Sequence, residues 1–305
     1  MFIDIHVHVR ALPGPARGGR QAFATPEQLL ARYAPIGVER AVLLPLVSPE
    51  VYEPQSSQEI VEISRRHPDS FIPFCNVDPR AINNSSDAPL GNILDFYRNQ
   101  GCRGIGEVTA NLPFRDPMVR NLFRHVERVG FPLTFHIAPQ IGEMYGLYDD
   151  PGLPQLEQSL ADFPGLNFLG HSQTFWAEIG RLRKPFDRYG YPRYPIDAEG
   201  VVPQLFRQYP NLHGDLSAVS GCNALKRDPD YAVKFLDEFQ DRLLFGTDIC
   251  APDTPTPLVD FLTGLRAAGR ISATVFEKVA RGNAIRLLKL DGQTPSAHLG
   301  EPAHE

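Results

Sequence analysis

The sequence is poor in cysteine, in lysine and in long apolar runs. Its four cysteines, at positions 75, 102, 222 and 250, form no Cys-x-x-Cys pair, so we expect reduced thiols. No stretch approaches the roughly 18 apolar residues of a transmembrane helix. The first residues lack the basic and apolar segments of a secretory signal. The sequence therefore predicts a cytoplasmic protein with no membrane partner.

The chain also lacks an excess of basic residues. Its 305 residues include 30 Lys and Arg against 36 Asp and Glu, which gives a formal net charge of −6. Because binding to phosphate backbones requires a basic surface, we do not expect nucleic acid as a partner. A small-molecule substrate fits this composition better.

Short apolar runs recur along the chain, and segments of helical periodicity lie between them. The length of the runs and their β-branched and aromatic content favour buried strands. They cover residues 2–9, 39–47, 71–77, 103–108, 132–137, 166–172, 211–216 and 242–248. The helical patterns cover residues 55–66, 90–99, 117–129, 153–163, 230–239, 257–268 and 273–290, and a capping box at residues 25–28 begins a further helix.

Eight strands alternating with helices predict an α/β fold, a parallel sheet closed as a single-domain (β/α)8 TIM barrel over residues 1–290. An open doubly wound sheet is the alternative, but no Gly-x-Gly-x-x-Gly follows the first strand. Residues 10–24 and 172–200 are long loops after strands 1 and 6, on the face where such barrels carry active sites. The polar residues 291–305 are expected to form a disordered tail.

His6 and His8 lie two residues apart on the first predicted strand. Because side chains alternate along a strand, both imidazoles face the same way, and Asp4 is expected on that face. The opposite face, which is expected to pack under the helices, then holds Ile3, Ile5, Val7 and Val9. Two adjacent imidazoles inside a barrel indicate a divalent metal ion.

Four further polar residues close other predicted strands, namely Glu107, His136, His171 and Asp248. The carboxyl ends of barrel strands meet on one face, so these groups are expected to converge with the two histidines. Nitrogen and oxygen ligands without cysteine suit Zn²⁺ best, and also Mn²⁺, Fe²⁺ or Ni²⁺.

These motifs together resemble the amidohydrolase superfamily. They are the His-x-His near the N-terminus and the segments GIGEV, FHI, FLGHSQ and LLFGTD. More narrowly, they resemble the amidohydrolase-related family, which includes aminocarboxymuconate-semialdehyde decarboxylase and resorcylate-type decarboxylases. The resemblance extends from His6 to the segment at residues 282–288.

The resemblance implies a metal-activated water that hydrolyses an amide, ester or lactone bond of a small molecule. The implied metal ligands are His6, His8, His136 and Asp248. Asp248 is also the implied proton acceptor, and His171 the implied acid–base or polarising group. Non-oxidative decarboxylation of an aromatic or unsaturated acid at the same metal site is the alternative. A catalytically silent barrel is disfavoured, because every expected ligand position is filled. A homo-oligomer is a further expectation of the resemblance.

The number of metal ions depends on Glu107. Many relatives with two ions use a carboxylated lysine at this strand, but all five lysines of this chain lie elsewhere. A single ion with Glu107 beside it is favoured. The alternative is two ions bridged by Glu107 with His171 as a ligand, because the GIGEV segment also resembles TatD-type deoxyribonucleases.

Substrate contacts are predicted from the two long loops. Gln173 and Trp176 follow His171 closely and offer a polar contact and an aromatic wall, although Trp176 packed on the barrel is the alternative. Arg10 and the pair Arg17 and Arg20 follow the first strand. Two or more arginines near the metal would favour a carboxylated substrate. On the seventh strand, His213 is expected in the core, and Asp215 is a candidate partner of a site residue.

Overall fold

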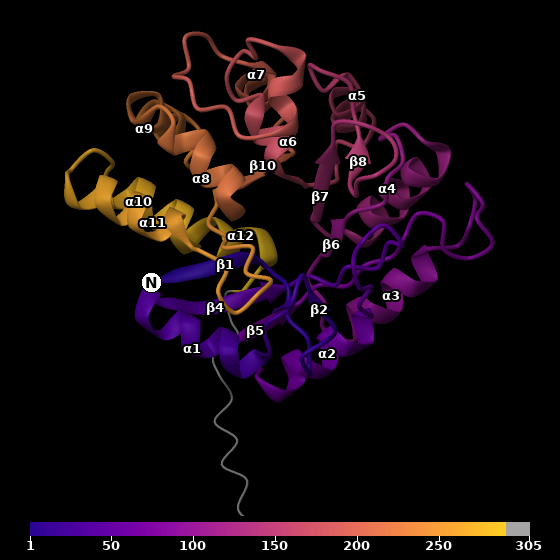
Figure 1. Cartoon of the computed structure of the whole chain (residues 1–305). Helices are drawn as coiled ribbons and strands as arrows, with labels where there is room; N and C mark the ends of the chain where they lie inside the picture. Colours follow the sequence, from indigo (N-terminus) through magenta and orange to yellow (C-terminus); the bar gives the residue numbers. More distant parts are fainter. Residues whose placement is uncertain (291–305) are drawn as a thin grey trace, which may run out of the picture.

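Eight parallel strands alternate along the chain with helices and form the wall of an α/β barrel (Figure 1). The computed structural model describes residues 1–290. The strands of the wall are β1 (Phe2–Val7), β4 (Val38–Leu43), β5 (Phe71–Pro73), β6 (Ile105–Val108), β7 (Leu133–Ala138), β9 (Phe168–His171), β10 (Leu212–Asp215) and β11 (Leu243–Leu244). They lie at the predicted positions, and several are shorter than predicted.

The wall consists of two parallel sheets, one of order β1-β4-β5 and one of order β11-β10-β9-β7-β6. Isolated parallel bridges join their edges, from Cys75 to Ile105 on one side and from Val7 to Ile249 on the other. The strand order around the wall therefore follows the chain order, as the predicted TIM barrel requires.

Helices surround the strands (Figure 1). They are α1 (Pro26–Ile36), α2 (Ser57–Arg66), α3 (Gly91–Asn99), α4 (Pro117–Val129), α5 (Pro154–Asp162), α6 (Gln173–Ala177), α7 (Val201–Gln208), α8 (Ala218–Lys226), α9 (Pro229–Glu238), α10 (Pro257–Ala267), α11 (Ala273–Glu277) and α12 (Asn283–Leu288). Short helices of other types are η1 (Pro185–Tyr189) and η2 (Lys278–Gly282). The capping box of α1 is confirmed, because Thr25 and Gln28 exchange side-chain to backbone hydrogen bonds.

Four helices have no counterpart among the predicted ones. The loop at residues 172–200 contains the short α6 and η1. Helices α7 and α8 flank β10, and each has only eight or nine residues. The five residues of α6 are too few to show a helical period. Pro203 lies within α7 and Gly221 within α8, and both residue types disfavour a helix in the sequence.

Further short strands lie outside the wall. The loop after β1 forms an antiparallel hairpin of β2 (Ala16–Arg17) and β3 (Arg20–Gln21). Strand β8 (Leu147–Tyr148) pairs with the end of β7. Both segments follow strands of the wall, so they lie on the side where the strands end.

The barrel interior is filled by an apolar cluster with members from strands that are not neighbours. It contains Ile3, Ile5, Val42, Leu44, Ile72, Phe74, Leu169, Leu244, Ala284 and Leu288. Ile3 and Ile5 therefore face the interior, which corrects their predicted position under the helices. Asp4 instead accepts a hydrogen bond from Tyr33 of α1, at 2.6 Å, so it does not share the face of His6 and His8. The pairing of β1 with β4 is irregular between Asp4 and Val7, and such an irregularity changes the side-chain phase.

No helix within residues 1–290 combines the length and the apolar character needed to cross a membrane. The predicted tail at residues 291–305 lies outside the described residues.

Candidate metal centre

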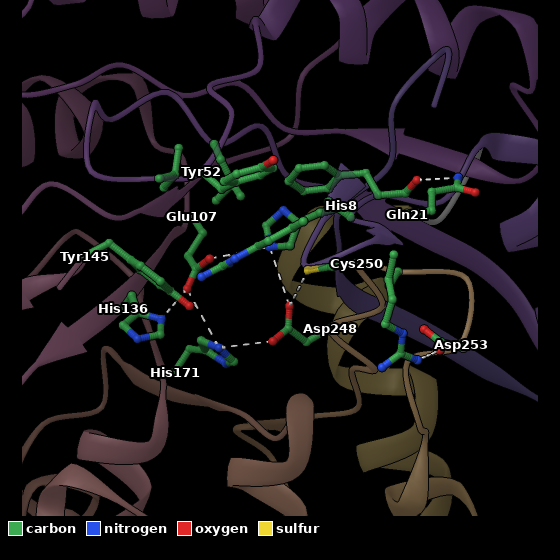
Figure 2. Close-up of a pocket in the computed structure, with 17 residues that line it drawn as sticks. His8, Gln21, Tyr52, Glu107, His136, Tyr145, His171, Asp248, Cys250 and Asp253 are labelled. Atoms are coloured by element: carbon green, nitrogen blue, oxygen red, sulfur yellow. Dashed lines mark hydrogen bonds and ion pairs between the residues drawn. The ribbon is translucent and has the colours of Figure 1, made fainter. Parts of the chain in front are cut away.

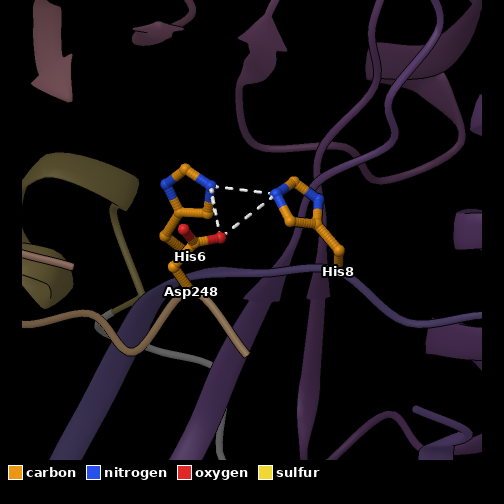
Figure 3. A group of neighbouring side chains, drawn as sticks. All are labelled: His6, His8 and Asp248. Carbon is orange, nitrogen blue, oxygen red and sulfur yellow. Dashed lines mark hydrogen bonds and ion pairs between the residues drawn. The ribbon is translucent and has the colours of Figure 1, made fainter. Parts of the chain in front are cut away.

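Six side chains predicted at the strand ends converge on one point at the carboxyl face of the barrel. Figure 2 shows all of them except His6, which is drawn in Figure 3. They come from β1 and the residue after it, from β6, β7 and β9, and from the segment after β11. They are His6, His8, Glu107, His136, His171 and Asp248. All except Asp248 are buried. The side chain of Asp248 is 23% exposed, which makes it the member that solvent reaches most readily.

The first group of ligand atoms joins His6, His8 and Asp248 (Figure 3). The Nε2 atoms of the two histidines lie 3.0 Å apart. Oδ1 of Asp248 lies 3.6 Å from Nε2 of His6 and 3.5 Å from Nε2 of His8. Three donors of nitrogen and oxygen therefore surround one point.

The second group joins Glu107, His136 and His171. Oε1 of Glu107 lies 2.7 Å from Nδ1 of His136 and 3.7 Å from Nε2 of His171. Its other oxygen, Oε2, lies 3.6 Å from Nε2 of His6 and 3.4 Å from Nε2 of His8. Glu107 thus faces both groups.

The resemblance implies a ligand set of His6, His8, His136 and Asp248, whose members occur in both of these groups. His136 lies with Glu107 and His171, and His8 lies with His6 and Asp248. A third group joins His6, His171 and Asp215, so His6 and His171 each belong to two groups. The structure brings all the expected side chains to one site.

Hydrogen bonds at the far side of each ring set which histidine nitrogens face the centre. Nδ1 of His8 lies 2.8 Å from the carbonyl oxygen of Leu44, and Nδ1 of His6 lies 2.6 Å from Oδ2 of Asp215. Both partners only accept, so each Nδ1 carries a proton and donates it. When both rings are neutral, as metal binding requires, the two Nε2 atoms present lone pairs to one another at 3.0 Å. Such an arrangement fits a metal cation between them.

The buried charges of the site also favour a bound cation. Burial lowers the pKa of His6, but the negative charges of Asp215 and Asp248 outweigh burial and hold this pKa well above its usual value. Burial raises the pKa of Glu107, but the charge of His136 and hydrogen bonds from the histidines hold it well below its usual value. Ionised carboxylates in this site therefore need positive charge beside them, which either a protonated His6 or a bound divalent ion supplies.

His171 differs from His6 in its electrostatic setting. Burial, together with the neighbouring charge of His6, lowers the pKa of His171 to about 4. The ring is therefore neutral at pH 7, which is the form that binds metal ions. Nδ1 of His171 lies 3.0 Å from Oγ of Ser217, so Nε2 faces the centre.

Two backbone features position the carboxylates. Gly106 adopts a φ of 133°, and a Cβ atom there would lie 2.6 Å from the carbonyl oxygen of Thr134. Only glycine fits this position, directly before Glu107. Asp248 itself has a φ of 54°, a left-handed conformation that aspartate adopts more readily than most residues.

A pocket of about 290 Å³ opens onto the centre. His8, Glu107, His136, His171 and Asp248 form its polar floor. Phe23, Leu46, Val51, Tyr52, Tyr145 and Cys250 supply apolar and aromatic surface. The β2–β3 hairpin contributes Arg17, Arg20 and Gln21. A small molecule that combines an apolar body with polar groups fits such a pocket.

Several predicted substrate contacts lie elsewhere. Trp176 is 1% exposed and donates a hydrogen bond from its indole nitrogen to the carbonyl oxygen of Asp215, at 2.8 Å. It belongs to the core, so its predicted role as a pocket wall is wrong. Gln173 is half-buried at the start of α6 and is not among the pocket-lining residues. Arg10 pairs with Glu53 and Glu59 and does not line the pocket.

Sequence reasoning missed Tyr52 and Tyr145, because isolated aromatic residues in loops carry no spacing signal. It did find Asp215, whose inward phase on the seventh strand made it a candidate partner of a site residue. In the structure, Oδ2 of Asp215 lies 2.6 Å from Nδ1 of His6, so Asp215 is the partner of a site residue. His213, two residues earlier, is buried as expected.

Comparison with known proteins defines the class. A family model described as amidohydrolase matches residues 3–290. The match spans most of the chain, so the chain belongs to this amidohydrolase family and is an enzyme of the amidohydrolase superfamily. None of the curated proteins searched matches it.

Solved structures with the same fold include an uncharacterised TIM-barrel protein from Bordetella bronchiseptica, with a TM-score of 0.61 and 17% identity. The comparison covers 94% of this chain and 98% of that one. The 5-carboxyvanillate decarboxylase of Sphingomonas paucimobilis has a TM-score of 0.60 and 18% identity over 94% and 98% of the two chains. A zinc-bound amidohydrolase from Burkholderia multivorans has a TM-score of 0.58 and 16% identity over 95% and 99%. At these identities, the likeness establishes the TIM-barrel fold.

Proposed function

We propose that the chain is a metal-dependent hydrolase that cleaves an amide, ester or lactone bond in a small molecule. The observation that carries the proposal is the position of Glu107, whose two oxygens face the two separate ligand groups. A shared carboxylate supports a centre of two divalent ions with Glu107 as the bridge. This proposal replaces the single ion favoured on sequence alone, and it makes His171 a ligand rather than an acid–base group.

We assign the ligands to the two ions by the groups that contain His8 and His136. His6, His8 and Asp248 would hold one, and His136 and His171 would hold the other. Zn²⁺ suits these donors best, and Mn²⁺, Fe²⁺ and Ni²⁺ share the preference for imidazole and carboxylate. Bound ions of this kind polarise a carbonyl oxygen and lower the pKa of a coordinated water toward about 7.

Asp248 is the proposed proton acceptor. Its Oδ1 faces His6 and His8, its Oδ2 lies 3.8 Å from Nε2 of His171, and its side chain reaches the pocket. As water adds to the carbonyl carbon of the substrate, Asp248 takes a proton from that water. It then returns the proton to the nitrogen or oxygen that leaves when the bond breaks.

The rest of the pocket positions the substrate. Tyr145 lies beside His136, with 4.6 Å between the ring centres, and presents a hydroxyl donor to a substrate oxygen. The apolar side chains of Phe23, Leu46 and Val51 bury the body of the substrate. These contacts hold the carbonyl group above the floor of the site.

Decarboxylation is the second candidate. Arg17 and Arg20 line the pocket, which favours a carboxylated molecule. One structure of the same fold is named a 5-carboxyvanillate decarboxylase. In this reaction the bond to the carboxylate breaks and the carbon left behind gains a proton.

The test is turnover by the metal-loaded protein. Aryl acetates, γ- and δ-lactones and anilides should yield acid products, and a panel of hydroxybenzoates should release no carbon dioxide. Glu107→Gln should abolish hydrolysis, whereas Glu62→Gln, on the exposed face of α2, should leave it unchanged. Carbon dioxide release without hydrolysis would replace the hydrolase assignment with the decarboxylase one.

A further inference from the structure

The pocket has an uneven distribution of charge. Its floor holds the carboxylates of Glu107 and Asp248 among histidines. Its basic lining residues other than histidine are Arg17 and Arg20, both from the β2–β3 hairpin. One side of the pocket is therefore cationic.

The two arginines lie directly opposite one another across the hairpin. The turn between them is Gly18–Gly19, with φ values of 59° and 78°, as a two-residue turn of type I′ requires. Like charges that face each other across a strand pair repel. An anion beside each of them would relieve this repulsion.

Arg20 has such an anion and Arg17 does not. The guanidinium of Arg20 pairs with the carboxylate of Asp253. Within residues 1–290, no carboxylate lies within 4.0 Å of the Arg17 guanidinium, which instead lies over the ring of Tyr52, 5.4 Å from its centre. A guanidinium that stacks on an aromatic ring keeps its N–H donors available for a ligand.

The Arg17 guanidinium faces the pocket. It lines the pocket together with Tyr52, Tyr145 and Cys250. The hairpin is also held in place. Tyr52 donates a hydrogen bond to the carbonyl oxygen of Ala16, at 2.8 Å, and Gln21 donates one to Oε1 of Gln28, at 2.8 Å.

We propose that Arg17 binds a carboxylate of the substrate and so determines the substrate class. The substrate is a small acid whose carboxylate lies on the hairpin side of the pocket and is distinct from the group that reacts at the floor. A planar ring fits beside Tyr52, on which Arg17 already stacks. This inference rests on the proposed function for the identity of the reacting group, but the carboxylate contact can be tested without turnover.

The test compares two ligands that differ in one charge. Isophthalate carries two carboxylates, whereas 3-carbamoylbenzoate has nearly the same shape and carries one. We expect the metal-loaded protein to bind isophthalate about tenfold more tightly, as measured by calorimetry, because a charge-assisted hydrogen bond contributes this much. Arg17→Gln should remove the preference. Arg20→Gln, the matched change on the same hairpin, should keep most of it.

Three results would overturn the proposal. They are a wild-type protein without preference for isophthalate, an Arg17→Gln variant that keeps the preference, and equal losses in the two variants, which would indicate general electrostatic attraction. Because binding requires no turnover, failure of the hydrolase assay leaves this result intact. Conversely, an enzyme that hydrolyses neutral esters and ignores isophthalate would retain the proposed function and lose this inference.

Discussion

Oδ2 of Asp215 lies 2.6 Å from Nδ1 of His6, and both side chains are completely buried. The carboxylate holds the proton of His6 on Nδ1, so Nε2 faces the metal centre. Removing a hydrogen-bonded partner of this kind lowers metal affinity about 10- to 100-fold.

We therefore expect Asp215→Asn to bind Zn²⁺ about 10- to 100-fold more weakly than the wild type, with an unchanged fold. Competition with a chromophoric chelator measures the affinity, and circular dichroism reports the fold. Asn167→Asp, which changes a residue beside His213 and away from the centre, serves as the control. An Asp215→Asn variant with wild-type affinity would show that this contact does not support the ligand.

The ligand groups predict selective losses of metal. Asp248→Ala removes a ligand from the first group, and His136→Ala removes one from the second. Each variant should lose turnover and about half of its bound metal. His171→Ala should behave like His136→Ala. If His171→Ala loses activity but keeps all of its metal, His171 is an acid–base group and the proposed second ligand group is wrong.

Trp176 should affect stability rather than substrate binding. Its indole is buried against Phe175 and Phe235 and bonds to the backbone of β10. Trp176→Ala should lower the free energy of unfolding by about 3–5 kcal/mol, as truncation of large core side chains does. Trp176→Phe should cost less and leave KM unchanged. Urea unfolding measures the stability of these variants, and steady-state kinetics measures KM. A raised KM at unchanged stability would instead indicate that Trp176 forms a wall of the substrate pocket.

The lowered pKa of His213 predicts how the free energy of unfolding depends on pH. Burial, with the nearby charges of Arg242 and Arg286, lowers the pKa of His213 to about 3. In the unfolded chain the same ring titrates near its ordinary value of 6.5. Between these values the unfolded chain binds a proton that the folded chain does not. The free energy of unfolding therefore falls as pH decreases from 6.5, by up to about 1.4 kcal/mol per pH unit from this group.

His213→Gln should remove this contribution. Urea unfolding of both proteins at several pH values between 4.5 and 7.5, a range chosen around the ordinary histidine pKa, gives the two slopes. The wild type should lose more stability than the variant as pH decreases. Parallel curves would mean that His213 titrates alike in both states.

The residues at strand ends made most of the site predictable. His6 and His8 share a face, and Glu107, His136, His171 and Asp248 close their strands, so their convergence follows from parallel-strand geometry. The phase of Asp4 and Ile5 could not be predicted, because an irregularity in β1 changes the alternation. The partition of the ligands depends on which oxygen of Glu107 faces which ring, and residue spacing does not contain that information. Trp176 lies near His171 in sequence, but its side chain faces the core.

The metal content per chain tests the central claim most directly. It should be measured by mass spectrometry on protein purified without chelators or a polyhistidine tag, beside Glu107→Gln prepared in the same way. The account predicts about two ions per chain in the wild type and a loss of at least about one in the variant. A content of one ion per chain in both proteins would contradict the two-ion centre with Glu107 between the ions. It would support the single-ion site instead.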